Sequence, residues 1–495
     1  MPRISALTLL LLTGVAVHSY ALKPHWLRIS APHFEMYTTG GEQQALAELR
    51  MFEQVRHFFL ETAGAKSVGS NPVRIIAFHS RQEYQPYSPN ASAFAYYEQA
   101  RSGDYIVLED IAPEHRAAAL HEYTHLVLTH EGLKLPVWLS EGLADLYSTL
   151  SFDGGRVTVG APLPGRMYAL RTEPWLPLDT LFAAGQSSPE YNDRQLASIF
   201  YAESWALVHM LRFGDGYAPH FGAFLAAIAS GAAVPSALET AFGKTPAQLY
   251  LDLQACVRKA GMNEAVYRVG LPTASVDAQS AEPSALEVKL LLARMLASNP
   301  WKQAEGEQRL ETLAAEYPSN PEIEESLGYL AWQERNPAQA RVHFAAAVAR
   351  GSRDAQMIAY LAAMDQAAGV SASQVLALLQ KALAFNPNDY ETRLHVALMA
   401  VRQKRFQLAD TAFAGLKQVK PADTYPVMMA LAYMQFERND LAGAKSYAEQ
   451  AAQDANQPSQ RVAAQKVAAC ASALQPQPTV AENIQVDSTT VSMQP

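Results

Sequence analysis

Hydrophobic and polar positions alternate along the first part of the chain with two different periods. Period-two alternation predicts three strands, at residues 26–37, 72–78 and 104–109. A helical period covers residues 43–63, and helical periodicity also runs from residue 113 to about residue 259. An Asp-Gly-Gly turn predicts a hairpin at residues 152–159. We therefore expect an α+β domain over residues 22–268.

Beyond residue 284 the apolar pattern repeats at a fixed interval. Small residues recur at spacings of 35, 34, 35 and 35, at Ala293, Gly328, Ala362, Ala397 and Ala432. A second series starts the second helix of each predicted pair, at Ala340, Ala409 and Ala444. Small side chains let neighbouring helices approach closely, so each pair can bury a face on the next. This pattern resembles tetratricopeptide (TPR) repeats. We expect an all-α solenoid of four or five repeats over residues 285–474, with an unrelated helical bundle as the alternative.

Two segments lack the periodicity of a folded core. Residues 269–284 are rich in Pro, Ser, Ala and acidic groups, which is typical of an interdomain linker. Residues 475–495 are poor in core-forming side chains, so we expect a disordered tail there.

The start of the chain has the pattern of an export signal. Arg3 precedes an apolar run over residues 4–17, and the small residues Ser19 and Ala21 follow it, as at a signal-peptidase site. The run is shorter than the ~20 residues that a transmembrane helix needs. We expect residues 1–21 to be a signal peptide, the protein to be exported to a bacterial periplasm or secreted, and no transmembrane span.

Composition removes further classes of function. Hydrophobic residues at 49% and charged residues at 18% are typical of a folded chain. The 39 Lys and Arg residues are outnumbered by 48 Asp and Glu residues, so no basic surplus supports nucleic-acid binding. Cys256 and Cys470 fall in different predicted domains, which excludes a disulfide scaffold, and we expect both to be buried as apolar residues.

The residues that carry candidate chemistry begin with an H-E-x-x-H pattern formed by His121, Glu122 and His125. Side chains four residues apart lie one above the other on a helix, so both imidazoles can reach one cation with Glu122 beside it. The flanking residues are uncharged, which suits a buried metal helix. The alternative is the same pattern without a metal.

A second predicted helix, VWLSEGLADLY, follows a turn and brings Glu141 back toward the histidines. Three protein ligands, His121, His125 and Glu141, would leave a fourth position open for water, as in catalytic zinc sites. Asp145 lies four residues after Glu141 on the same face and could accept the other ring N–H of a histidine ligand. The alternative for Asp145 is a solvated helix residue.

Over residues 26–259 the sequence resembles the gluzincin metallopeptidases, through its H-E-x-x-H, the WLSEGLADLY segment and the closing AFGKTPAQLYLDL. The resemblance implies a zincin-like fold that binds Zn²⁺ through His121, His125 and Glu141. It also implies that Glu122 is the general base that activates the metal-bound water.

The larger aminopeptidase-like gluzincins add a Tyr-x-x-Gly motif about 60 residues beyond the glutamate ligand, and here Tyr201 lies 60 residues after Glu141. A phenol donates a directed hydrogen bond without adding charge, which suits a developing oxyanion. Ser204 replaces the usual glycine, and a packed aromatic is the alternative for Tyr201. The Gly-x-Met-Glu-Asn stretch with which those enzymes hold a free amine is missing, which favours an endopeptidase.

The strand at residues 104–109 is expected to pair with an extended peptide substrate. Glu98 and Glu109 could anchor a substrate amine, but ordinary acidic residues are the favoured reading, and we expect His115 and His130 to lie outside the ligand set.

These expectations combine into an exported zinc metallopeptidase that acts on a peptide or protein substrate and carries TPR-like repeats for recruiting a partner or substrate. The alternative is an inactive zinc-binding scaffold for protein interactions. Retention of Glu122 favours the enzyme, because a structural site needs no base.

Overall fold

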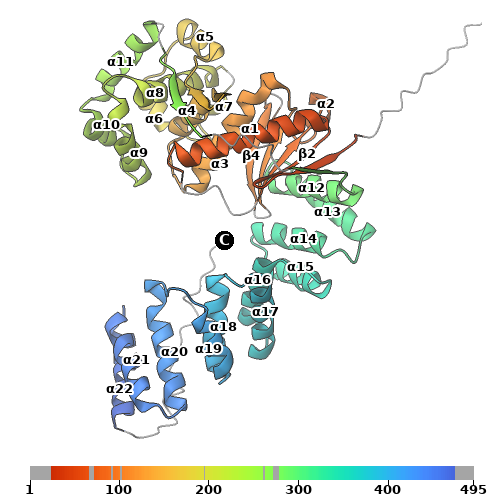
Figure 1. Cartoon of the computed structure of the whole chain (residues 1–495), viewed down its shortest axis with the longest axis vertical. Helices are drawn as coiled ribbons and strands as arrows, with labels where there is room; N and C mark the ends of the chain where they lie inside the picture. Colours follow the sequence, from red (N-terminus) through yellow and green to blue (C-terminus); the bar gives the residue numbers. More distant parts are fainter. Residues whose placement is uncertain are drawn as a thin grey trace, which may run out of the picture. The chain divides into compact units, whose positions relative to one another are not determined.

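The computed structural model describes residues 24–65, 72–90, 93–100, 103–193, 195–259, 262–270 and 278–473. The predicted signal peptide and tail lie outside these residues. The described residues form two compact units, shown in Figure 1. The first runs to Leu291 and includes Ser298–Lys302, and the second consists of Leu292–Ala297 and the described residues from Gln303 onward, so the division falls within helix α12 (Ala285–Ser298). No described helix is long and apolar enough to cross a membrane.

A six-stranded sheet organises the first unit, in the order β4-β5-β3-β2-β1-β9. Its strands are β1 (Leu27–Ser30), β2 (Phe34–Thr38), β3 (Val73–Ala77), β4 (Ala95–Ala100), β5 (Gly103–Leu108) and β9 (Gln279–Ala281). The contacts of β2 with β3 and of β3 with β5 are parallel, and the others are antiparallel. The strand predicted at 26–37 is divided into β1 and β2 by a turn, and β9 lies inside the segment expected to be a linker.

The edge of this sheet differs from the expectation for residues 104–109. Strand β5 is paired on both sides, with β3 and with β4, so it has no free edge for a substrate. The edge strand is β4, which was not among the predicted strands. The Glu109 N–H donates to the Phe94 carbonyl at 2.8 Å. Strand alternation therefore turns the backbone groups of Ala95, Tyr97 and Gln99 outward.

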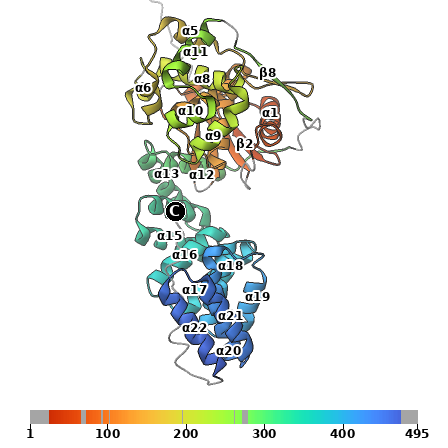
Figure 2. The same ribbon diagram turned by 90° about the vertical axis from the view of Figure 1, so that its left-hand side faces the viewer.

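Helices complete the first unit, and α1 (Glu42–Glu61) confirms the helix predicted at 43–63. The others that matter for the site are α3 (Arg116–His130), α4 (Val137–Tyr147), α5 (Pro164–Thr172), α7 (Pro189–Asn192) and α8 (Ala197–Phe213). The remaining long helices are α9 (Phe221–Ala229), α10 (Val234–Phe242) and α11 (Pro246–Arg258). A hairpin of β6 (Ser151–Asp153) and β7 (Arg156–Val159) confirms the predicted turn and pairs with β8 (Ala265–Arg268). Figure 2 shows α1, α5, α8, α9, α10 and α11 from a second direction.

Close packing of α4 on α8 fixes the helix that carries Glu141. A Cβ atom on Gly142 would stand 2.4 Å from the Ser204 carbonyl oxygen, so only glycine permits this approach. Trp138 and Trp205 are fully buried beside it. The two helices therefore form a rigid support on which the site is built.

The second unit is all-helical and its helices come in pairs. Its bounds are α13 (Gln303–Glu316), α14 (Pro321–Gln333), α15 (Pro337–Ala349), α16 (Ala355–Ala367), α17 (Ala372–Phe385), α18 (Tyr390–Arg402), α19 (Phe406–Ala414), α20 (Thr424–Glu437), α21 (Leu441–Asp454) and α22 (Pro458–Ser472). The small residues of the predicted repeat are fully buried at Ala362, Ala397 and Ala432, and Gly328 faces the Phe344 ring. The fold is thus an α+β unit followed by an all-helical region.

The ends of the first helices in these pairs repeat the same backbone conformation. A residue with positive φ follows each one, at Arg335, Gly369, Lys404 and Asn439. The next residue donates its N–H five residues back, as from Asn336 to Ala331. This left-handed cap satisfies helix-end carbonyls and turns the chain into the second helix.

Candidate metal centre

Helix α3 places three of the predicted residues at one site. It begins after the 3₁₀ turn Pro113–His115, where a proline loses no helical hydrogen bond. His121 and His125 are four residues apart on this helix, and their ring centroids are 4.8 Å apart. Gly132, with a φ of 65°, follows the helix and turns the chain, and α4 then begins after Pro136.

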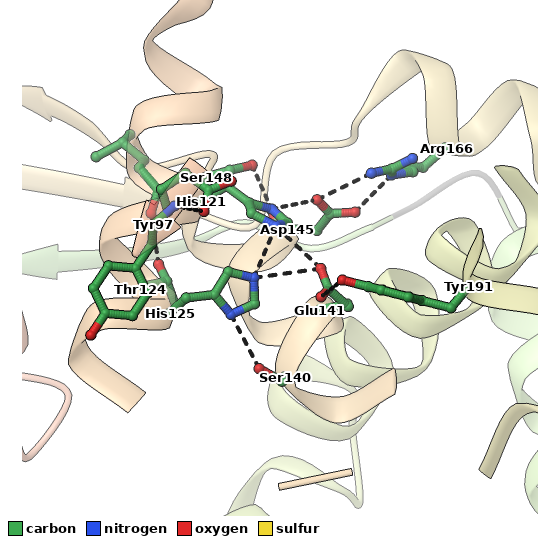
Figure 3. A network of polar contacts seen from close by, with 12 residues as sticks. Tyr97, His121, Thr124, His125, Ser140, Glu141, Asp145, Ser148, Arg166 and Tyr191 are labelled. Atoms are coloured by element: carbon green, nitrogen blue, oxygen red, sulfur yellow. Dashed lines mark hydrogen bonds and ion pairs between the residues drawn. The ribbon is translucent and has the colours of Figure 1, made fainter. Parts of the chain in front are cut away.

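Glu141 on α4 completes a triangle of donor atoms with the two imidazoles (Figure 3). The Nε2 atoms of His121 and His125 are 3.1 Å apart, and Oε2 of Glu141 lies 3.2 Å from the first and 3.5 Å from the second. Four ligands at about 2.05 Å in a tetrahedron stand about 3.3 Å from one another. The spacing and the donor types therefore fit a zinc ion with one position left open.

Each member of this triad has a further polar partner. The predicted contact of Asp145 is present, with its Oδ1 3.0 Å from Nδ1 of His121. Ser140 Oγ lies 3.2 Å from Nδ1 of His125, and the Tyr191 hydroxyl donates to Oε1 of Glu141 at 3.1 Å. The second atom of every candidate ligand is thus occupied, which orients the first atom toward a common point.

Asp145 is itself held by Arg166, a residue that no sequence motif indicated. The guanidinium donates from Nε to Oδ2 at 2.6 Å and from Nη2 to Oδ1 at 3.3 Å. Its Cζ also lies 4.8 Å from the centroid of the Tyr201 ring, within cation–π distance. Arg166 therefore connects the partner of His121 with the predicted tyrosine.

The charges around the triad favour a cation. Burial alone would raise the pKa of Glu141, but its hydrogen bonds with His121 and His125 lower it well below the ordinary value. Burial would likewise lower the pKa of His121, yet the hydrogen bonds to Asp145 and Glu141 raise it well above 6.5. Both shifts favour positive charge between the two carboxylates, and a bound cation would supply that charge.

Glu122 lies beside the triad and does not belong to it. The backbone N–H of Tyr97, on the edge strand β4, donates to Oε2 of Glu122 at 2.8 Å. Burial raises the pKa of Glu122, and the nearby imidazoles of His121 and His125 oppose that rise. The carboxyl group is therefore placed next to the candidate ligands, and burial shifts its pKa upward.

Two cavities, of about 420 and 660 Å³, meet at His121, Glu122 and Tyr201. The smaller is lined by mostly apolar groups, including Phe94, Ala117, Ala118, Leu163 and Pro164, together with Arg166. The larger has a polar lining that includes Asn90, Thr129, Ser140, Gln186 and Tyr191. The centre is therefore open on two sides. Burial raises the pKa of Tyr201, so its hydroxyl keeps the proton that it would donate.

The other glutamates and histidines considered from the sequence do not belong to the triad. They bond to other residues or lie away from the two cavities. Glu109 is buried and bonded to Arg81 at 2.6 Å. Burial raises the pKa of Glu98 to about 7, but Glu98 is not among the residues that line the two cavities. His115 lies 2.8 Å from Asp110, and His130 lies 2.6 Å from Asp104.

The two cysteines are less buried than expected, although Cys256 packs against the apolar core of the first unit. Both are free, and each is half-buried where full burial was expected. Both lie on amphipathic helices, Cys256 on α11 and Cys470 on α22, where positions at the margin of the apolar face stay partly exposed.

Comparisons with known proteins do not extend these assignments. Neither a family model nor a curated protein matches the chain. The function is therefore argued from the residues and geometry of the site.

Proposed function

We propose that the first unit is a zinc metallopeptidase of the gluzincin type, which hydrolyses peptide bonds. The observation that carries the proposal is the triangle of donor atoms from His121, His125 and Glu141, with sides of 3.1, 3.2 and 3.5 Å. Zinc bound by two imidazoles and one carboxylate supplies an acidified water and a Lewis acid for the substrate carbonyl.

Glu122 is the general base in this proposal. Its carboxylate accepts a proton from the attacking water and then delivers that proton to the leaving amine. A pKa raised by burial suits both steps, because the group must accept and release a proton near neutral pH. The Tyr97 N–H holds Oε2 and so fixes the direction of the carboxylate.

Tyr201 supports the reaction as a hydrogen-bond donor. Its side chain lines both cavities next to Glu122, and a protonated phenol can donate to the carbonyl oxygen as negative charge develops. We expect Tyr201→Phe to lower kcat while KM stays close to that of the wild type. An unchanged kcat would remove Tyr201 from the mechanism.

The substrate in this proposal is an extended peptide, cut within its length. The outer edge of β4 offers the backbone groups of Ala95 and Gln99 and the carbonyl of Tyr97 for strand addition, while the Tyr97 N–H stays bonded to Glu122. Cavities on two sides of the centre leave room for substrate before and after the cleaved bond. These features favour an endopeptidase over an enzyme that removes single terminal residues.

The helical unit would recruit a protein partner or the substrate. Its repeated helix pairs, with buried small residues about 34 residues apart, support a TPR-like solenoid. Export of the whole protein through residues 1–21 belongs to the same proposal and follows from the sequence alone.

Metal content and cleavage together test the proposal. We expect about one zinc per purified chain, retained by Glu122→Gln and lost from His121→Ala and Glu141→Ala. The wild type should cleave a peptide library, and Glu122→Gln should not. Zinc binding without any cleavage that depends on Glu122 would overturn the enzyme and leave the zinc-binding scaffold as the function. Unchanged zinc in the His121 and Glu141 variants would overturn the ligand assignment.

A further inference from the structure

The carboxylate of Glu141 has its two oxygens in different surroundings. Oε2 faces both imidazoles, at 3.2 and 3.5 Å, whereas Oε1 accepts a hydrogen bond from the Tyr191 hydroxyl at 3.1 Å. No other described residue donates to Oε1. Only 6% of Glu141 is exposed, so little water can replace that hydrogen bond.

Tyr191 is held in place from several directions. It lies in the short helix α7, where the Asn192 side chain donates to the carbonyls of Gln186 and Ser188 at 2.6 and 3.0 Å. The Tyr191 ring meets the buried Phe200 ring edge-on at a centroid distance of 5.9 Å. It also lies 5.8 Å from the Tyr201 ring. The hydroxyl is thus aimed at Glu141 before any ligand binds.

We infer that Tyr191 is a positioning residue that makes Glu141 a one-oxygen metal ligand. This inference rests on the zinc site of the proposed function. A carboxylate can bind a cation through one oxygen or through both, and the choice changes the coordination number. With Oε1 engaged by Tyr191, only Oε2 faces the two imidazoles, so each of the three side chains would offer one donor atom to a bound cation.

Removing the Tyr191 hydroxyl would leave Oε1 of Glu141 without its hydrogen-bond donor. In Tyr191→Phe the ring still packs on Phe200, but a buried carboxylate oxygen loses its donor. That oxygen can then turn toward the metal, which raises the coordination number. Loss of partners of this kind lowers metal affinity by about 10- to 100-fold. Tyr191→Phe should therefore bind zinc at least tenfold more weakly than the wild type.

Two measurements on the full-length chain test this inference. The first is zinc affinity by competition with a chromophoric chelator. The second is the visible absorption of the protein loaded with Co²⁺ in place of zinc, which is intense for four-coordinate cobalt and weakens as the coordination number rises. We expect Tyr191→Phe to bind zinc more weakly and to show a weaker cobalt band. Tyr168→Phe is the matched control, because Tyr168 is 68% exposed and contributes no hydrogen bond to the triad.

The outcomes separate this inference from the proposed function. If the wild type binds one zinc and cleaves peptides, but Tyr191→Phe keeps the same zinc affinity within twofold and the same cobalt spectrum, the inference is overturned and the proposed function stands. If the wild type binds no zinc, both are overturned. Thermal unfolding of the metal-free proteins checks the variant's fold. Equal unfolding temperatures with weaker zinc binding support positioning, and equal losses of stability and affinity contradict it.

Discussion

Glu203 places a carboxyl group in the core of the first unit, and its replacement gives a stability prediction with a defined sign. The side chain is 0% exposed. Oε1 accepts the Leu176 N–H at 2.7 Å, while Oε2 is buried without a hydrogen-bond partner. Burial raises the pKa of Glu203 from 4.5 to about 8, against the opposing effect of the Leu176 N–H. The folded protein therefore holds the neutral acid over most of the physiological range.

Glu203 should make stability depend on pH. A pKa raised in the folded state contributes stability that is complete below the unfolded pKa and is lost as the pH rises through the folded pKa. For a rise from 4.5 to about 8 the loss by pH 9 is at most about 5 kcal/mol, at about 1.4 kcal/mol for each pKa unit. Water penetration reduces it, so we expect about 2–4 kcal/mol.

Glu203→Gln removes the ionisable carboxyl group and keeps a side chain of nearly the same size and shape. Its amide carbonyl can still accept the Leu176 N–H, so at pH 5 its free energy of unfolding should match that of the wild type within about 1 kcal/mol. At pH 9 the variant should be more stable by about 2–4 kcal/mol. Urea denaturation, monitored by tryptophan fluorescence, measures the free energy of unfolding at both pH values. Glu239→Gln, at an exposed position, is the matched control. An equal difference at pH 5 and pH 9 would show that ionisation of Glu203 does not affect the stability of the fold.

Three further substitutions test other parts of the structure. Asp145→Asn should lower zinc affinity about tenfold in the chelator assay, because it removes the charge that holds His121, whereas the exposed Asp179→Asn should not. Gly142→Ala should cost at least about 2 kcal/mol in urea denaturation, because its Cβ would meet the Ser204 carbonyl at 2.4 Å, and Gly222→Ala, with open space around it, should cost little. Arg335→Gly should raise the unfolding free energy of the helical unit by about 0.5–1 kcal/mol, because Arg335 has a φ of 59°, and Arg335→Ala should give no gain.

The part of the site that local spacing determines was predictable. His121 and His125 lie on one face because helix geometry places residues four apart together, and Glu141 and Asp145 obey the same rule. Arg166 lies 21 residues from Asp145 and Tyr191 lies 50 from Glu141, on separate helices. Those contacts depend on how α5, α7 and α8 pack, which no local pattern reports.

The order of strands in the sheet could likewise not be predicted from local sequence patterns. Alternation predicted the strand at 104–109, now β5, but it says nothing of strand order, so the free edge was assigned to the wrong strand. The edge strand β4 was missed because Glu98 and Gln99 interrupt its apolar pattern. In the second unit, the repeat spacing identified small residues that the structure buries, because helix contact there requires a small side chain at each interval.

The most direct test of the proposed activity is the origin of the oxygen in a newly formed carboxyl terminus. Zinc-loaded protein is incubated with an unfolded protein substrate in H₂¹⁸O, and the products are analysed by mass spectrometry. We expect internal cleavage products that carry one ¹⁸O in each new carboxyl terminus with the wild type, and none with zinc-loaded Glu122→Gln. Equal cleavage by both proteins, or no new termini from the zinc-loaded wild type, would contradict the proposed activity.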